Sequence, residues 1–192
     1  MESERRELER VNAFSDGVFA IAITLLVLNI DIPSVSGGQL DEALKSLWDD
    51  LLAYMIGFAV IGLFWFGHHR LFSTLQRSNG HLVLANMVLL GLIGLMPFTT
   101  GLLGAYDEPI VVALYAANVG IATIADGCIH LVARVDGLEA EGVEHEKHAL
   151  LLTGLRAAVF FLSIPIAYVA STGLAQWLWL LLIGIVFLRR WG

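Results

Sequence analysis

Five long stretches of this chain contain no aspartate, glutamate, lysine or arginine, and this feature constrains the fold more than any other. The stretches cover residues 17–30, 51–69, 78–106, 109–125 and 157–188. An α-helix rises about 1.5 Å per residue, so roughly 20 mostly apolar residues are needed to cross about 30 Å of hydrocarbon. Stretches of this length and composition are typical of membrane-spanning helices.

The last stretch is too long for one ordinary span, because as a single helix it would reach roughly 48 Å. The sequence Ser171-Thr172-Gly173 offers a turn within it. We therefore predict an all-α polytopic membrane protein with a single domain, residues 1–192, and six spans. The approximate spans are residues 10–30, 50–71, 80–103, 109–133, 148–170 and 174–190.

The composition excludes several other classes of protein. Of all residues, 57% are hydrophobic and only 15% are charged, whereas about 25% are charged in soluble domains. A water-facing globule with so little charge could not cover its own surface. The net charge of −7 argues against a nucleic-acid partner. The single cysteine, Cys128, cannot form an internal disulfide or a thiolate metal site.

Basic residues are distributed very unevenly across the six predicted spans. Lys45 alone lies on one side of the membrane. The other side, which holds both termini, has the remaining bases: Arg5, Arg6, Arg10, Arg70, Arg77, Arg134, Lys147, Arg156, Arg189 and Arg190. Because basic loops stay in the cytoplasm, we expect both termini to be cytoplasmic. The acids that precede the first apolar stretch, and its length, argue against a cleaved signal peptide.

One stripe of residues runs along the predicted first helix. Gly17, Ile21, Thr24 and Leu28 follow each other at spacings of four, three and four, and Leu25 borders them. This spacing places them on one face of a helix. Spacing alone is typical of a ridge facing lipid or another helix, and it does not indicate a pore.

Ionisable residues inside spans are candidates for function. His68 and His69 are adjacent, so on a helix they point about 100° apart and cannot readily chelate one metal ion. We therefore expect no metal site, and the chain lacks the motifs of an enzyme.

Three further ionisable residues, Asp126, His130 and Arg156, fit either a structural pairing or a proton relay. The relay makes a small proton-coupled transporter the alternative function.

Three patterns in the first half of the chain resemble a known family. The stretch RVNAFSDGVFAIAITLL, residues 10–26, resembles the RxxxFSD signature of the bacterial transmembrane protein 175 family of potassium channels. WFGHHRLF, residues 65–72, is similar to the W-x-x-H-H-R-x-F stretch of that family. Asn86 and Pro97-Phe98-x-Thr100 also fit the family pattern.

The resemblance implies a homotetramer of six-helix subunits around a central pore that is lined by the first helix. It implies an apolar constriction at Ile21, followed by Leu25 and Leu28, with Thr24 as the polar lining residue. It also implies a network that fixes the first helix, made of Arg10, Phe14, Ser15, Asp16, Trp65, His68 and Asn86. The TVGYG filter of ordinary potassium channels is absent from the sequence.

The function that the resemblance implies is a potassium-permeable cation channel with a hydrophobic gate. We expect no cofactor beyond the permeant K⁺, with Na⁺, Cs⁺ and H⁺ as weaker permeants. The expected partners are the lipid bilayer and other copies of the chain. The expected location is the plasma (inner) membrane of a bacterium.

Overall fold

The apolar stretches fold into long α-helices in the computed structural model, which describes residues 2–30, 44, 47–140 and 149–191. A 3-10 helix, η1 (Leu26–Asn29), continues the first α-helix directly. The α-helices in the described ranges are α1 (Glu2–Leu25), α3 (Trp48–Phe72), α4 (Gly80–Ala105), α5 (Pro109–Val135), α6 (Ala149–Val169) and α7 (Thr172–Trp191).

Helix α1 begins before the predicted first span, because the charged segment at its start is also helical. Arg5 and Glu9 lie one turn apart there, with Nε and Oε1 separated by 3.6 Å. Such a pair supports a helix that projects into water. At the other end of the chain, α6 and α7 are separated by the turn that the sequence predicts near Ser171.

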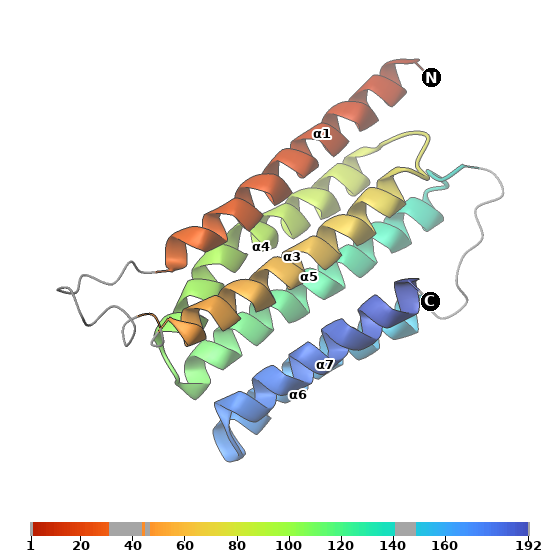
Figure 1. The fold of residues 1–192 in the computed structure, drawn as a ribbon. Coiled ribbons are helices and arrows are strands. Elements are labelled where there is room, and N and C mark those ends of the chain that lie inside the picture. The colour runs from red at the N-terminus through yellow and green to blue at the C-terminus, as the bar shows by residue number, and fades with distance from the viewer. Residues whose placement is uncertain (1, 31–43, 45–46, 141–148, 192) are drawn as a thin grey trace.

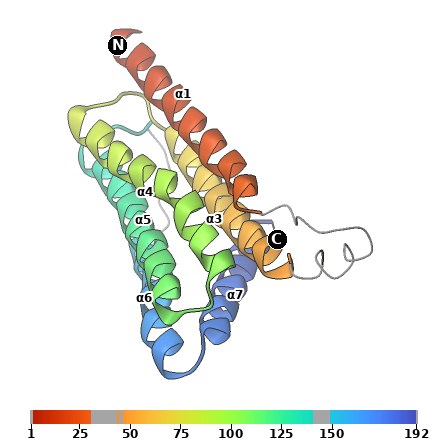
Figure 2. The same ribbon diagram turned by 90° about the vertical axis from the view of Figure 1, so that its left-hand side faces the viewer.

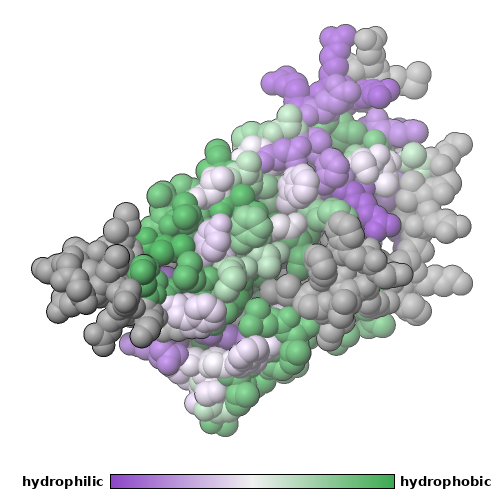
Figure 3. Space-filling view, viewed as in Figure 1, coloured by the Kyte–Doolittle hydropathy of each residue, from purple (hydrophilic) through white to green (hydrophobic). Residues whose placement is uncertain are grey.

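The helices have the length and surface of membrane spans. In the described part of the chain, five helical segments are long and apolar enough to cross a bilayer, and Thr172–Leu182 in α7 is a shorter apolar segment. Figure 3 shows hydrophobic residues over the body of the bundle and hydrophilic residues gathered mainly at the end where α1 begins. The chain is therefore a multi-pass membrane protein.

The helices form a bundle in which α1 lies at one side and the α6–α7 hairpin at the other (Figures 1 and 2). The most extensive packing joins α4 to α5 and α5 to α6. Within the described residues, α1 contacts only α3, α4 and its own continuation η1. One long side of α1 is therefore not covered by the described part of its own chain.

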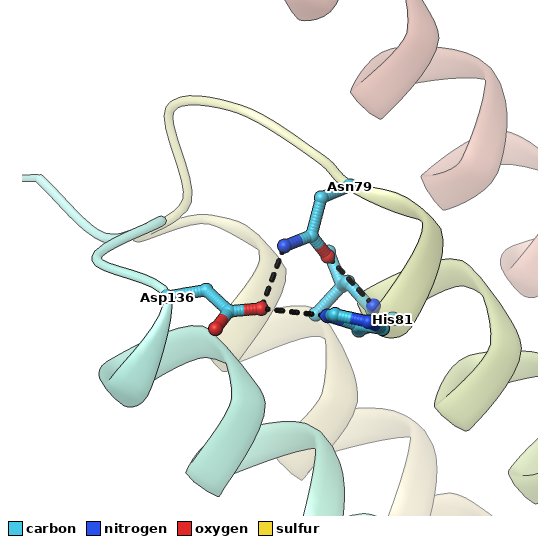
Figure 4. Close-up of polar contacts among 4 residues, drawn as sticks. Asn79, His81 and Asp136 are labelled. Carbon is cyan, nitrogen blue, oxygen red and sulfur yellow. Dashed lines mark hydrogen bonds and ion pairs between the residues drawn. The ribbon is translucent and has the colours of Figure 1, made fainter.

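A clasp of loop residues closes the end of the bundle where α1 begins. Helix α5 ends at Val135, and Gly137 follows its C-cap with a φ of +59°, a left-handed conformation that glycine adopts without strain. Just before it, Asp136 Oδ2 accepts hydrogen bonds from Asn79 Nδ2 at 2.7 Å and from His81 Nδ1 at 3.2 Å (Figure 4). These two bonds, with the Asn79 bond the stronger influence, hold the pKa of Asp136 below its ordinary value. The clasp ties the start of α4 to the end of α5.

Candidate functional site

The inner face of α1 is packed tightly against its own subunit. The residues of this inner face are Ser15, Phe19, Ala22 and Leu26. Each is at most 2% exposed, and they follow each other at spacings of four, three and four. They contribute to the core that α1 shares with α3 and α4. This face fixes the rotation of α1 about its own axis.

The outer face of α1 carries the stripe singled out in the sequence. Each stripe residue comes two positions after a buried one, and two positions turn a helix by about 200°, so the two sets lie on opposite faces. Ile21 is 61% exposed and Leu28 is 74% exposed, while Leu25 at the border is 42% exposed. Gly17 and Thr24 are also exposed. The stripe is thus an open surface on the single chain.

Thr24 contributes the polar group of this surface. Its hydroxyl donates to the backbone oxygens of Ala20 and Ile21, both at 2.9 Å. Because the proton is used inside the helix, the oxygen is left to face outward as an acceptor.

Behind the stripe, a buried hydrogen-bond network connects α1, α3 and α4. Asn86 on α4 donates from Nδ2 to Ser15 Oγ at 2.9 Å, and its Oδ1 lies 2.8 Å from His68 Nε2 on α3. Ser15 in turn donates to the backbone oxygen of Val11 at 2.9 Å. All three side chains, Ser15, His68 and Asn86, are almost fully buried. Since each polar group is removed from water, each depends on the next for its partner.

A second contact anchors α1 at its more exposed edge. Trp65 on α3 donates from Nε1 to Asp16 Oδ1 at 2.9 Å. His69, which follows buried His68, stacks on Trp65 with ring centroids 5.4 Å apart. The two adjacent histidines therefore do different things, as expected from their angular separation. Among the residues that the structure describes, no group of three or more His, Cys, Asp or Glu side chains could hold a metal ion.

Two members of the predicted network do not join it within one subunit. Phe14 is 54% exposed, and Arg10 is also exposed. Arg10 makes no hydrogen bond or ion pair within the described part of the chain. Both residues are exposed on the side of α1 that no other helix in the described ranges covers.

A contact at the far end of α1 was not predicted. Asn29, at the end of η1, donates from Nδ2 to the backbone oxygen of Pro97 at 2.8 Å. Gly101, one turn further along α4, makes room for this side chain, since a Cβ there would lie 2.7 Å from Asn29 Oδ1. The sequence places Asn29 at the end of the first span, but it does not indicate which helix the amide contacts.

The residues of the alternative function lie away from α1. Asp126 and Arg156 line one small cavity between α3, α5, α6 and α7, whereas His130 is exposed on α5 and does not line it. Asp126 and Arg156 thus share one cavity, as a pairing of the two residues would require, and His130 lies outside its lining.

Comparison with known proteins shows that part of the chain matches a family model. Residues 10–97, which contain the stripe of α1 and the buried hydrogen-bond network through Asn86, match a family model described as the endosomal/lysosomal potassium channel TMEM175. This segment of the chain therefore resembles the TMEM175 family.

Curated relatives named as channels match about half of the chain. A potassium channel of Streptomyces collinus is 45% identical over 101 residues, which is 52% of this chain and 49% of that protein. The endosomal/lysosomal proton channel TMEM175 of Mus musculus is 40% identical over 98 residues, 46% of this chain and 20% of that protein. The chain spans about half the length of the bacterial relatives that it matches.

The structural likeness extends over nearly the whole chain. The crystal structure of a lysosomal potassium-selective channel TMEM175 homologue from Chamaesiphon minutus has a TM-score of 0.79 at 27% identity. The match covers 97% of this chain and 100% of that one. The helices beyond residue 97 thus share the fold, although the family model ends there.

Proposed function

We propose that this chain is one of four identical subunits of a potassium-permeable cation channel. The observation that carries the proposal is the open outer face of α1. A stripe of exposed apolar residues lies on the helix that belongs to the family segment, and no helix of the same chain packs against it within the described residues. Four such faces around an axis would enclose a pore.

In the proposed pore, the side chains of Ile21 form the narrowest ring. Leu25 and Leu28 continue the apolar lining beyond it, and Thr24 adds a ring of hydroxyl oxygens one turn away. Isoleucine offers no ligand to replace water around an ion, so an ion crosses only partly dehydrated or when the ring widens. Apolar constrictions of this kind can gate by dewetting.

Selectivity in this pore would arise from hydration. Potassium holds its water less tightly than sodium, so a narrow apolar ring disfavours sodium more. We expect a modest preference for K⁺, with Na⁺, Cs⁺ and H⁺ as weaker permeants and no cofactor. This contrasts with filters built from rings of carbonyl oxygens.

The proposal includes a topology and a framework for α1. Each subunit would cross the plasma membrane of a bacterium six times, with α7 as the sixth span and both termini in the cytoplasm. The bonds of Ser15, Asp16, Trp65, His68 and Asn86 would hold α1 in place within each subunit. Arg10 and Phe14 would add contacts between subunits.

The deciding experiment measures reversal potentials of purified protein in planar bilayers under opposed potassium and sodium gradients, with empty bilayers as the control. We expect a potassium-biased reversal potential and a current that does not require a pH gradient. Saturating, electrically silent flux that depends on a pH gradient would instead favour the proton-coupled transporter. Native mass measurement of the same sample should give four copies.

A further inference from the structure

A cavity of about 250 Å³ lies at the end of the bundle opposite the start of α1. It is bounded by α3, the end of α4, the loop before α5 and the start of α7. Its floor is apolar and buried, formed by Ala53, Ile56 and Leu103. None of its lining residues belongs to α1. The cavity is therefore separate from the proposed pore.

Polar groups gather on one side of this cavity. Its remaining lining includes Tyr106, Asp107, Thr172 and Gln176. Thr172 Oγ1 donates a hydrogen bond to Asp107 Oδ1, which holds the carboxylate in position at the rim. A second carboxylate is close, since Asp50 Oδ1 lies 2.9 Å from where a Cβ on Gly104 would be.

The charge of the lining favours a cation. None of the lining residues is a lysine or arginine. The helix ends at the cavity offset each other, because α4 ends there with its carbonyls while α7 begins there with its N–H groups. The Asp107 carboxylate therefore decides the sign of the local charge.

The shape and chemistry of the lining select an organic cation over a metal ion. Calcium takes six to eight oxygen ligands, and the lining offers one carboxylate above an apolar floor. A cavity of this size is close to the lower limit of small-molecule sites, which measure roughly 300–1,000 Å³. Tyr106 also lines the cavity, and aromatic faces attract ammonium groups.

We propose that this cavity binds a small organic ammonium compound. The ammonium group would sit against Asp107 and Tyr106, and an apolar stem of a few carbons would lie on Ala53, Ile56 and Leu103. The headgroup of an aminophospholipid carries the same ammonium group, so the test must separate a free amine from a lipid.

The test uses calorimetric titration of the purified, lipid-depleted protein with n-butylammonium. We expect saturable binding, with 1-butanol, the uncharged molecule of similar shape, at least tenfold weaker. Asp107→Asn should weaken binding about three- to fivefold, because Asp107 is exposed and an exposed ion pair contributes up to about 1 kcal/mol. Glu108→Gln is the matched control, because this neighbouring exposed carboxylate does not line the cavity, and it should bind within about twofold of the unmodified protein.

A second variant blocks the cavity without touching its charge. Gly173 lines the cavity and has open space where a Cβ would lie. Gly173→Phe should abolish butylammonium binding while leaving the thermal unfolding midpoint unchanged. Equal binding of butanol, equal effects of Asp107→Asn and Glu108→Gln, or binding of phosphatidylethanolamine alone would overturn the proposal.

Discussion

The amide of Asn86 on α4 and the hydroxyl of Ser15 on α1 are joined by a hydrogen bond of 2.9 Å, although 71 positions separate them in the sequence. Both side chains are buried. The bond lies on the face of α1 opposite the stripe, so it controls which side chains the helix presents outward. Its energy is thus coupled to the orientation of the proposed pore lining.

Ser15→Ala tests this bond. The substitution leaves Asn86 Nδ2 buried without its acceptor, which should lower the stability by about 1–3 kcal/mol. Thermal unfolding in detergent measures the loss. Ser73→Ala is the control, because Ser73 donates only to the backbone of Arg70 at an exposed site, and it should change stability by less than about 0.5 kcal/mol. Equal effects of the two substitutions would show that the buried bond contributes nothing.

Ile21→Ala tests the constriction. Removing the branched side chain widens the proposed ring, so conductance should rise and the preference for potassium over sodium should fall. Single-channel recording in planar bilayers measures both quantities. Ile121→Ala is a matched control, since Ile121 is 47% exposed on α5, away from the stripe. An unchanged permeability ratio in Ile21→Ala would place the constriction elsewhere.

Asp16→Ala tests how α1 is anchored. The substitution removes the acceptor of the Trp65 indole N–H, so α1 should be held less firmly and assembly should suffer more than permeation. Light scattering after size-exclusion chromatography gives the fraction of tetramer. Trp65→Phe keeps the ring but removes the donor, and it should change the tetramer fraction in the same direction. A fully assembled Asp16→Ala channel with altered selectivity alone would contradict the structural role.

Gly101→Ala tests the close approach of Asn29 to α4. A Cβ at this position would lie 2.7 Å from Asn29 Oδ1, so the bond to Pro97 should be displaced and stability should fall by about 1–3 kcal/mol. Gly94→Ala is the control on the same helix. It has open space at that position, and better helix propensity should leave it neutral or stabilised by up to about 1 kcal/mol. Asn29→Ala should rescue Gly101→Ala partly, since it removes the clashing group.

Asp136→Asn tests the clasp through pH. The pKa of Asp136 is lowered in the folded chain, so its stabilising contribution is present above its ordinary value of 3.8 and is lost as pH falls through the lowered pKa. Melting midpoints between about pH 6 and pH 3 should therefore fall less steeply in Asp136→Asn than in the unmodified protein. Glu108→Gln, at the opposite end of the bundle, should keep the original slope. Identical slopes for all three proteins would show that Asp136 does not contribute to the loss of stability in acid.

The membrane-spanning helices could be predicted from the sequence, because a segment that lies in lipid must be apolar over its whole length. Runs without charge predict apolar helices, and the long final run with Ser171-Thr172-Gly173 predicts the break before α7. The early start of α1 at Glu2 has a different signal in the sequence, because the charged N-terminal segment is helix-prone although it leaves no hydropathy signal.

The candidate site was only partly predictable, because spacing along a helix gives a face but not its neighbour. Spacing placed Ile21 and Thr24 together, yet only the packing of Phe19 and Leu26 shows that their side faces outward. The bond from Asn29 to Pro97 depends on where two helices cross, which no local pattern encodes. The sequence likewise does not show that Arg10 points away from its own subunit.

The limited contact of α1 with its own chain has a further consequence for biogenesis. A newly inserted subunit would present the stripe to lipid tails, and only later, in the assembled channel, to water and ions. Isoleucine and leucine are stable in lipid, and the Thr24 hydroxyl proton is already bonded inside the helix. A charged stripe would tolerate the second environment but not the first. The apolar character of the proposed pore lining would then serve the unassembled chain in lipid as well as the passage of ions.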